Sequence, residues 1–222
     1  MLIKQNLLKI KFGLTSKTRL VAVSKNQSVD AIKEAYNAGQ RIFGENKAQE
    51  LTQKQPLLPA DIEWHFVGHL QTNKVKYIAP FVSLIHSIDS LSLLYEVNRC
   101  ASKYNRIIPC LLQFHIATEE TKFGLNLNEA IAILKSAEYK AMKHIKITGI
   151  MGMASLTEDV ALINKEFATL KHHFDFLKAN LFDNEPTFCE LSMGMSGDYQ
   201  HALKHGSTLI RIGTGIFGER IY

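Results

Sequence analysis

Short apolar runs alternate with amphipathic segments along most of the chain. The apolar runs are rich in Val, Ile, Leu and Phe, and they occupy residues 20–25, 41–46, 62–70, 81–89, 107–117, 145–153, 187–195 and 207–218. They are nearly continuous in apolar character rather than alternating strictly with polar residues. That pattern is typical of strands in a parallel sheet covered on both faces. The sequence therefore predicts eight parallel strands.

The segments between these runs repeat their apolar residues at helical spacing. Clear examples are residues 29–39, 91–105, 128–142 and 161–180, and Gly39 and Gly206 stand where helix C-caps belong. Eight strand–helix units in about 200 residues favour an α/β fold, a single (β/α)8 TIM barrel, over an open doubly wound sheet. No Pro-, Gly- or Ser-rich linker interrupts the chain, so we expect one domain over residues 1–222.

The first residues predict a helix that covers one end of the barrel. Ile3, Leu7, Ile10 and Leu14 fall on one helical face. The net charge of +5 resides in the same segment, since five cations precede the first acidic residue: Lys4, Lys9, Lys11, Lys17 and Arg19. Neither aromatic residues nor a wider basic stripe accompanies them, and we therefore expect solvated lysines and no binding of nucleic acid or membrane.

Composition points to the cytoplasm. No apolar run approaches the roughly 20 residues that a membrane span needs, and the start of the chain lacks the apolar core and cleavage site of a signal peptide. Cys100, Cys110 and Cys189 are odd in number and lack metal-ligand spacing, which predicts buried thiols in a reducing compartment. Without an evident apolar patch, a monomer is the simplest expectation.

Polar side chains gather where the predicted strands end, which is the face that carries the active site in barrel enzymes. They include Lys25, Glu45, Asn46, His69, His86, His115, Ser192, Ser196 and Thr214. Lys25 ends the run LVAVSK, and the sequence leaves two interpretations of it open. It is either a solvated lysine after a buried strand or an amine placed to react with a carbonyl.

Two loops after the last two strands are suited to an anion. Residues 192–198 open a helix that Ser196 or Asp198 could cap, and Gly213, Thr214 and Gly215 follow the eighth strand. Barrels often build a phosphate site from these two loops. Arg211 lies inside the apolar stretch 209–212, where an unpaired guanidinium is costly, so it requires an ion pair or a ligand. No histidine spacing indicates a metal.

Seven ordered motifs resemble the pyridoxal 5′-phosphate (PLP) homeostasis protein family, also called the YggS/PROSC family. They are AVSK (22–25), FGEN (43–46), WHFVGHLQTNK (64–74), HSID (86–89), GIMGMAS (149–155), LSMGMSGD (191–198) and RIGTGIFGER (211–220). The resemblance implies a PLP-binding barrel related to the N-terminal domain of alanine racemases. It implies a Schiff base on Lys25, a phosphate held by Ser196, Gly213 and Thr214, Arg211 at the pyridine nitrogen and Asn46 beside the cofactor. Ser192 completes the expected cofactor-binding set.

Members of that family are thought to buffer or deliver PLP without an established reaction of their own, which implies a non-catalytic role here, with apo-enzymes as possible recipients. An arginine at the pyridine nitrogen weakens the electron sink on which PLP chemistry relies, and 222 residues leave no room for the second domain of a racemase. A PLP-dependent racemase and a cofactor-free Schiff-base aldolase are the alternatives. The chain departs from the family pattern at Asn26, His115 and Phe123.

Overall fold

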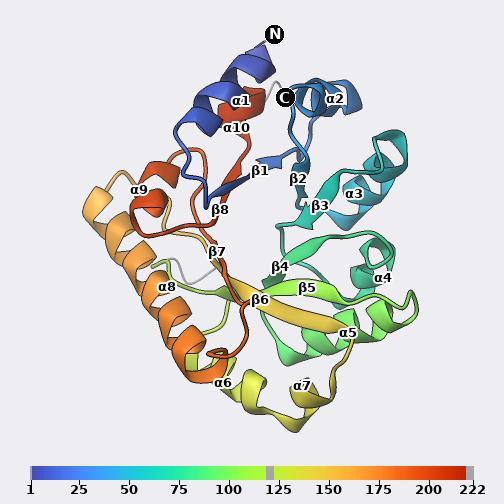
Figure 1. The fold of residues 1–222 in the computed structure, drawn as a ribbon, viewed down its shortest axis with the longest axis vertical. Coiled ribbons are helices and arrows are strands. Elements are labelled where there is room, and N and C mark those ends of the chain that lie inside the picture. Colours follow the sequence, from blue (N-terminus) through green and yellow to red (C-terminus); the bar gives the residue numbers. More distant parts are fainter. Residues whose placement is uncertain (1, 119–122, 219–222) are drawn as a thin grey trace.

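Eight parallel strands close into a barrel (Figure 1) in the computed structural model, which describes residues 2–118 and 123–218. Each strand pairs with the next in chain order, and β8 pairs with β1. The strands are β1 (Arg19–Val23), β2 (Ile42–Glu45), β3 (Glu63–Phe66), β4 (Leu84–Ile88), β5 (Ile108–Phe114), β6 (Ile145–Gly152), β7 (Glu190–Ser192) and β8 (Leu209–Ile212). The predicted (β/α)8 fold is confirmed.

Helices surround the barrel, mostly one after each strand (Figure 1). The α-helices are α1 (Leu2–Phe12), α2 (Val29–Asn37), α3 (Ala48–Lys54), α4 (Val75–Ile78), α5 (Leu91–Ser102), α6 (Leu127–Lys135), α7 (Ala137–Ala141), α8 (Val160–Leu181), α9 (Tyr199–Lys204) and α10 (Thr214–Phe217). Two short 3-10 turns, η1 (Gln55–Leu57) and η2 (Thr72–Lys74), follow α3 and precede α4. No helix in these described ranges is long and apolar enough to cross a membrane.

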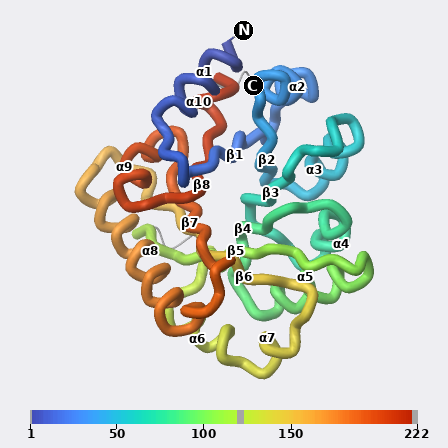
Figure 2. The backbone as a smooth tube through the Cα atoms, viewed as in Figure 1, coloured from blue at the N-terminus to red at the C-terminus, as the bar shows by residue number. Residues whose placement is uncertain are grey.

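The predicted N-terminal helix is present, and it packs against the core beside α2 and α10. Leu7 and Ile10 of α1 are buried, and Ile3 and Leu14 pack against the same core. The side chain of Asn6 also donates a hydrogen bond to the carbonyl of Ile216 in α10, at 3.0 Å. The first and last helices of the described chain therefore lie side by side (Figure 2).

Several element boundaries differ from the predicted ones. The run 207–218 is a strand only as far as Ile212, because the chain then turns into α10. Residues 128–142 form two helices rather than one, since Ser136 is extended (ψ 151°) and its hydroxyl accepts the N–H of Tyr139. Gly39 and Gly206 follow helix ends at φ 88° and 82°, which confirms both predicted caps.

Two side-chain predictions were wrong. Cys189 is exposed, because it precedes the residue at which β7 begins, whereas Cys100 and Cys110 are buried as expected. Asp198 occupies the N-cap position of α9, but its carboxylate accepts the N–H of Met195 instead of a helix N–H. Ser196 does not cap this helix either, because its hydroxyl oxygen accepts the N–H of Gly215 at 3.3 Å.

The barrel interior is partly polar. Five apolar side chains from five strands pack together there: Val21, Leu84, Leu111, Met151 and Leu209. Alongside them, four polar side chains from β3, β4, β7 and β8 are fully or almost fully buried: His65, His86, Ser192 and Arg211. Buried polar groups are costly unless they are hydrogen-bonded, so their partners determine how the carboxyl end of the barrel is organised.

Candidate functional site

One cavity of about 720 Å³ opens at the carboxyl ends of the strands. Its polar lining includes Lys25 two residues after β1, Asn46 directly after β2 and Arg211 within β8. The remaining lining residues come from the ends of β1, β3, β5, β6, β7 and β8 and the loops that follow them: Val23, Val67, Gly68, His69, Gln113, Phe123, Met153, Leu156, Met195, Ser196, Gly197, Gly213 and Thr214. The structure thus brings six of the seven predicted site residues around one cavity.

The seventh predicted residue, Ser192, is fully buried and is not among the described lining residues. Its hydroxyl lies behind Arg211 and accepts a hydrogen bond from Nη1 at 2.6 Å. Arg211 also donates Nη2 to the carbonyl of Gly152 at 3.0 Å. Ser192 therefore reaches the cavity through Arg211, whose guanidinium it helps to hold in place.

A hydrogen-bonded chain continues from Ser192 into the barrel. The hydroxyl of Ser192 lies 2.9 Å from Nδ1 of His86, and Nε2 of His86 lies 3.0 Å from Nδ1 of His65. The Ser192 hydroxyl accepts from Arg211 and still has one proton and one lone pair for His86, so the tautomer of His86 sets which group donates in the contacts with Ser192 and His65. Burial lowers the pKa of His65 to about 3 and the pKa of His86 well below its usual range. Both rings are therefore neutral at physiological pH.

Arg211 retains its charge in this buried position. Burial lowers its pKa to about 10, opposed by the charge of Asp198, so the guanidinium is protonated at neutral pH. It is 4% exposed and faces a cavity that also contains a lysine. A buried cation without a carboxylate bonded to it is costly. A ligand atom that accepts one hydrogen bond would offset part of that cost.

The loops after β7 and β8 form one continuous wall of the cavity. The N–H of Gly215 donates to the hydroxyl oxygen of Ser196 and joins the two loops. A β-carbon on Gly213 would come within 3.3 Å of the Val23 carbonyl, so the backbone lies close to β1 here. Glycine lets backbone amides approach a ligand closely. The last two residues of the RIGTGIFGER motif, 219 and 220, lie outside the described residues.

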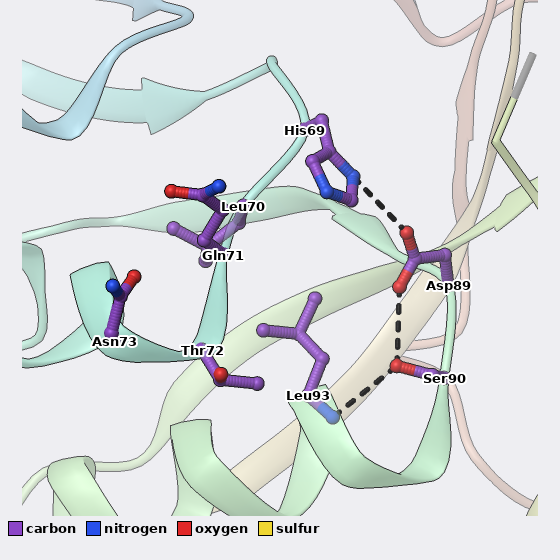
Figure 3. A pocket seen from close by; sticks show the side chains of 8 residues that line it. All are labelled: His69, Leu70, Gln71, Thr72, Asn73, Asp89, Ser90 and Leu93. Carbon is purple, nitrogen blue, oxygen red and sulfur yellow. Dashed lines mark hydrogen bonds and ion pairs between the residues drawn. The ribbon is translucent and has the colours of Figure 1, made fainter.

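His69 and Phe123 form another part of the cavity wall. Their rings stack with centroids 4.0 Å apart, and Nδ1 of His69 pairs with a carboxylate oxygen of Asp89 at 3.3 Å. His69 also borders a smaller cavity of about 420 Å³ beside η2 and the start of α5 (Figure 3). The described lining of that cavity contains no lysine or arginine, so the larger cavity is the candidate site.

PLP carries an aldehyde, a phosphate and a pyridine nitrogen, and the larger cavity offers a group for each. Lys25 supplies an amine, Ser196, Gly213 and Thr214 line the region suited to an anion, and the buried Arg211 can donate to a ring nitrogen. Val23, Val67, Met153 and Met195 provide apolar contact for an aromatic ring. The residues present therefore fit PLP.

Comparisons with known proteins lead to the same cofactor. Residues 2–221 match the family described as alanine racemase, N-terminal domain. The pyridoxal phosphate homeostasis protein of Aquifex aeolicus is 38% identical over 92% of this chain and 88% of its own. The chain belongs to the pyridoxal phosphate homeostasis protein family. The resemblance read from the sequence motifs is therefore confirmed.

Solved structures of this family superpose closely. PipY of Synechococcus elongatus is 35% identical, and the match covers 97% of this chain and 100% of that one. The TM-score is 0.89 for the structure without PLP and 0.86 for the structure with PLP bound. Alanine racemase from Bartonella henselae shares the fold alone, at a TM-score of 0.73 and 19% identity, and the match covers 99% of this chain and 60% of that chain.

Sequence reasoning named His86 and Ser192 but missed the hydrogen-bonded chain that links them to His65 behind Arg211. His86 contacts His65, which is 21 positions away in the sequence, and Ser192, which is 106 positions away. Local spacing carries no signal for such pairs. The position of both histidines inside apolar strands was visible in the sequence, but their partners were not.

Proposed function

We propose that this protein binds PLP in the cavity at the carboxyl end of the barrel and serves in cytoplasmic PLP homeostasis. The observation that carries the proposal is the meeting of Lys25, Arg211 and the loop containing Gly213 and Thr214 around one cavity. The PLP-bound structure of the relative PipY supports the choice of ligand. Bound PLP would supply an aldehyde, and Lys25 would supply the amine that reacts with it.

Each site residue has a proposed part in holding the cofactor. Lys25 is the amine for the aldehyde, Ser196, Gly213 and Thr214 hold the phosphate, and Asn46 lies beside the ring. Arg211 donates to the pyridine nitrogen, with Ser192 keeping the guanidinium in position. These assignments agree with the cavity lining and with the hydrogen bonds behind Arg211.

We propose a carrier or buffer rather than an enzyme. Arg211 is charged at neutral pH and can only donate, so a pyridine nitrogen beside it stays unprotonated. An unprotonated ring withdraws electrons weakly and stabilises a carbanion poorly. The names of the curated relatives, which refer to homeostasis, support this choice. Apo-enzymes that require PLP are the proposed recipients, and the carrier acts as a monomer.

Removal of Lys25 is the direct test. Purified wild-type protein incubated with PLP should turn yellow. Borohydride reduction should then fix the cofactor to Lys25, and mass spectrometry of the digested protein should locate the adduct on that residue. Lys25→Ala should lose this adduct and keep its thermal stability, because the side chain follows β1 and is only half-buried. Lys33→Ala, on the exposed face of α2, is the matched control and should behave as wild type. An adduct of wild-type yield on another lysine of Lys25→Ala contradicts the proposal.

A further inference from the structure

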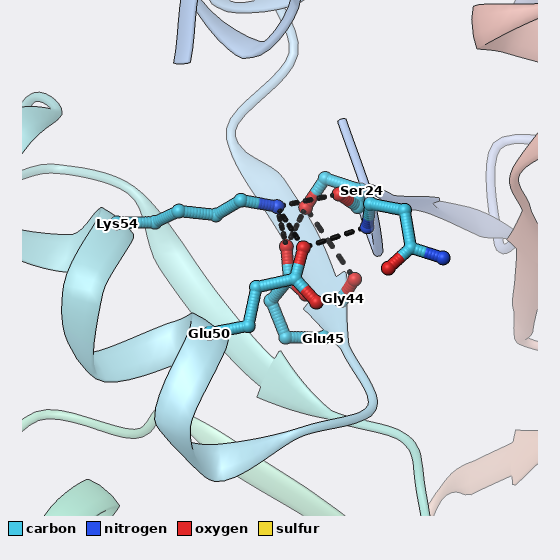
Figure 4. A network of polar contacts seen from close by, with 6 residues as sticks. Ser24, Gly44, Glu45, Glu50 and Lys54 are labelled. Carbon is cyan, nitrogen blue, oxygen red and sulfur yellow. Dashed lines mark hydrogen bonds and ion pairs between the residues drawn. The ribbon is translucent and has the colours of Figure 1, made fainter. Parts of the chain in front are cut away.

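A largely buried cluster of charged and polar side chains lies against the residues that flank Lys25 in the sequence (Figure 4). We call it the Lys54 cluster; it comprises Ser24, Glu45, Glu50 and Lys54. The ammonium of Lys54 donates to Oε1 of Glu45 at 2.8 Å and to Oε1 of Glu50 at 2.7 Å. The hydroxyl of Ser24 donates to the same oxygen of Glu45 at 2.6 Å. Side chains from β2, from α3 and from the residue directly after β1 thus converge at one point.

The cluster binds the backbone on both sides of Lys25. Before it, the carbonyl of Ser24 accepts a hydrogen bond from Lys54 Nζ at 2.7 Å. After it, the N–H of Asn26 donates to Oε1 of Glu50 at 2.6 Å. Asn26 is also one of two described non-glycine residues with positive φ, at 61°. Asparagine tolerates this left-handed conformation better than most residues, but it still needs support from its surroundings.

Stability alone does not account for the cluster. The side chain of Glu45 is 0% exposed and that of Lys54 is 9% exposed. Burial raises the pKa of Glu45 against the opposing effects of Lys54 and Ser24, and its Oε2 atom has no hydrogen-bond partner among the described residues. Apolar side chains of similar volume often stabilise such a position as well as or better than a buried ion pair. What the charged groups provide is directed bonds to the backbone at residues 24 and 26.

We infer that the Lys54 cluster positions Lys25 for covalent capture of PLP. Glu50 and Lys54 are positioning residues, since they act through the backbone that flanks Lys25. Glu45 is directly followed by Asn46, so the cluster also anchors the start of the loop that brings Asn46 to the cavity. The inference rests on the proposed function, because it assumes that Lys25 is the amine that joins PLP.

The decisive experiment separates capture from binding. Glu50→Ala removes the acceptor for the Asn26 N–H; alanine favours the helix, and the side chain of Glu50 is 19% exposed, so the variant should fold. Two ligands are compared: PLP, followed by the rate at which its bound chromophore forms, and pyridoxine 5′-phosphate, which has no aldehyde and is followed by calorimetry. The rate with PLP should fall by about 10–100-fold, which is the scale of effect that a small misplacement of a reacting group produces. Affinity for pyridoxine 5′-phosphate should change by less than about threefold, or roughly 0.7 kcal/mol.

Two further variants complete the test. Glu50→Gln keeps the side-chain volume but removes the charge that faces Lys54, and it should give a rate between wild type and Glu50→Ala. Lys171→Met breaks an exposed Lys171–Asp175 pair of the same i,i+4 spacing on α8 and should match wild type with both ligands. A wild-type rate in whichever Glu50 variant folds overturns the inference, and so does an equal loss for both ligands. If wild-type protein binds pyridoxine 5′-phosphate but never captures PLP on Lys25, it is the proposed function that fails.

Discussion

Arg211 is the residue that we propose to face the pyridine nitrogen of PLP, and it lines the cavity from within β8. It is buried, charged and held by Ser192 and the carbonyl of Gly152. Behind Ser192, the neutral rings of His86 and His65 continue the hydrogen-bonded chain. A protonated histidine there would repel the charged guanidinium within a low-dielectric interior. This hydrogen-bonded arrangement therefore requires both imidazoles to be uncharged.

Because His65 is buried in its neutral form, the free energy of unfolding should decrease as the pH falls. Burial lowers the folded pKa of His65 to about 3 from 6.5, so below pH 6.5 the unfolded chain binds a proton that the folded one does not. Stability from this source is complete above pH 6.5 and is lost as the pH falls towards 3, by about 1.4 kcal/mol per pH unit. His65→Asn should remove this contribution. Denaturant unfolding from about pH 6 to pH 4 should give a shallower pH slope for the variant than for wild type; parallel curves would show that His65 does not contribute.

The phosphate assignment is testable at Gly213. A valine there would bring its β-carbon to 3.3 Å from the Val23 carbonyl and would add side-chain bulk at a residue that lines the cavity. Gly213→Val combined with Ser196→Ala should weaken PLP by about tenfold or more, because a hydrogen bond to a charged group contributes roughly 1.5–3 kcal/mol. Phosphate-free pyridoxal should lose little affinity. Equilibrium titrations in which both ligands weaken equally would place the phosphate elsewhere.

At the scale of elements, substitutions in α1 test whether the N-terminal helix contributes to the stability of the fold. Leu7 is fully buried, whereas Leu8 on the same helix is 54% exposed. Leu7→Ala should lower the free energy of unfolding by about 2–5 kcal/mol, as buried leucines generally do. Leu8→Ala should change it by less than about 0.5 kcal/mol. Urea unfolding measures both, and similar values for the two variants would mean that α1 is not anchored to the barrel.

Strand order and strand-end chemistry were predictable from the sequence, because both depend on local patterns. Continuous apolar runs identify parallel strands, and residues such as Lys25 and Thr214 stand just beyond them. The boundaries were less predictable, since apolar character continues past the last paired residue, as in the run that contains α10. Burial of Lys54 could not be foreseen at all. It lies in the polar segment QELTQK, and its role depends on the distant Ser24.

At the scale of the whole molecule, the carrier and racemase interpretations make opposite predictions. PLP-loaded wild type should exchange the α-proton of alanine for deuterium no faster than free PLP does, because the proposed position of Arg211 would leave the ring unprotonated. It should pass its cofactor to an apo-enzyme that needs PLP. Exchange can be followed by NMR for alanine and several other amino acids. A rate well above that of free PLP, abolished in Lys25→Ala, would reject the carrier interpretation in favour of a racemase.

Closure of the barrel between β1 and β8 has a consequence for how the protein is made. Val21 pairs with Arg211 across this seam, so the proposed amine and the proposed arginine come from opposite ends of the chain. A ribosome that has synthesised the first seven strands has produced Lys25 but neither Arg211 nor Thr214. Such a nascent chain lacks two of the groups that we propose to hold the cofactor. On the proposed assignments, capture of vitamin B6 as PLP requires a completed eighth strand, and a chain that ends before residue 214 should not retain it.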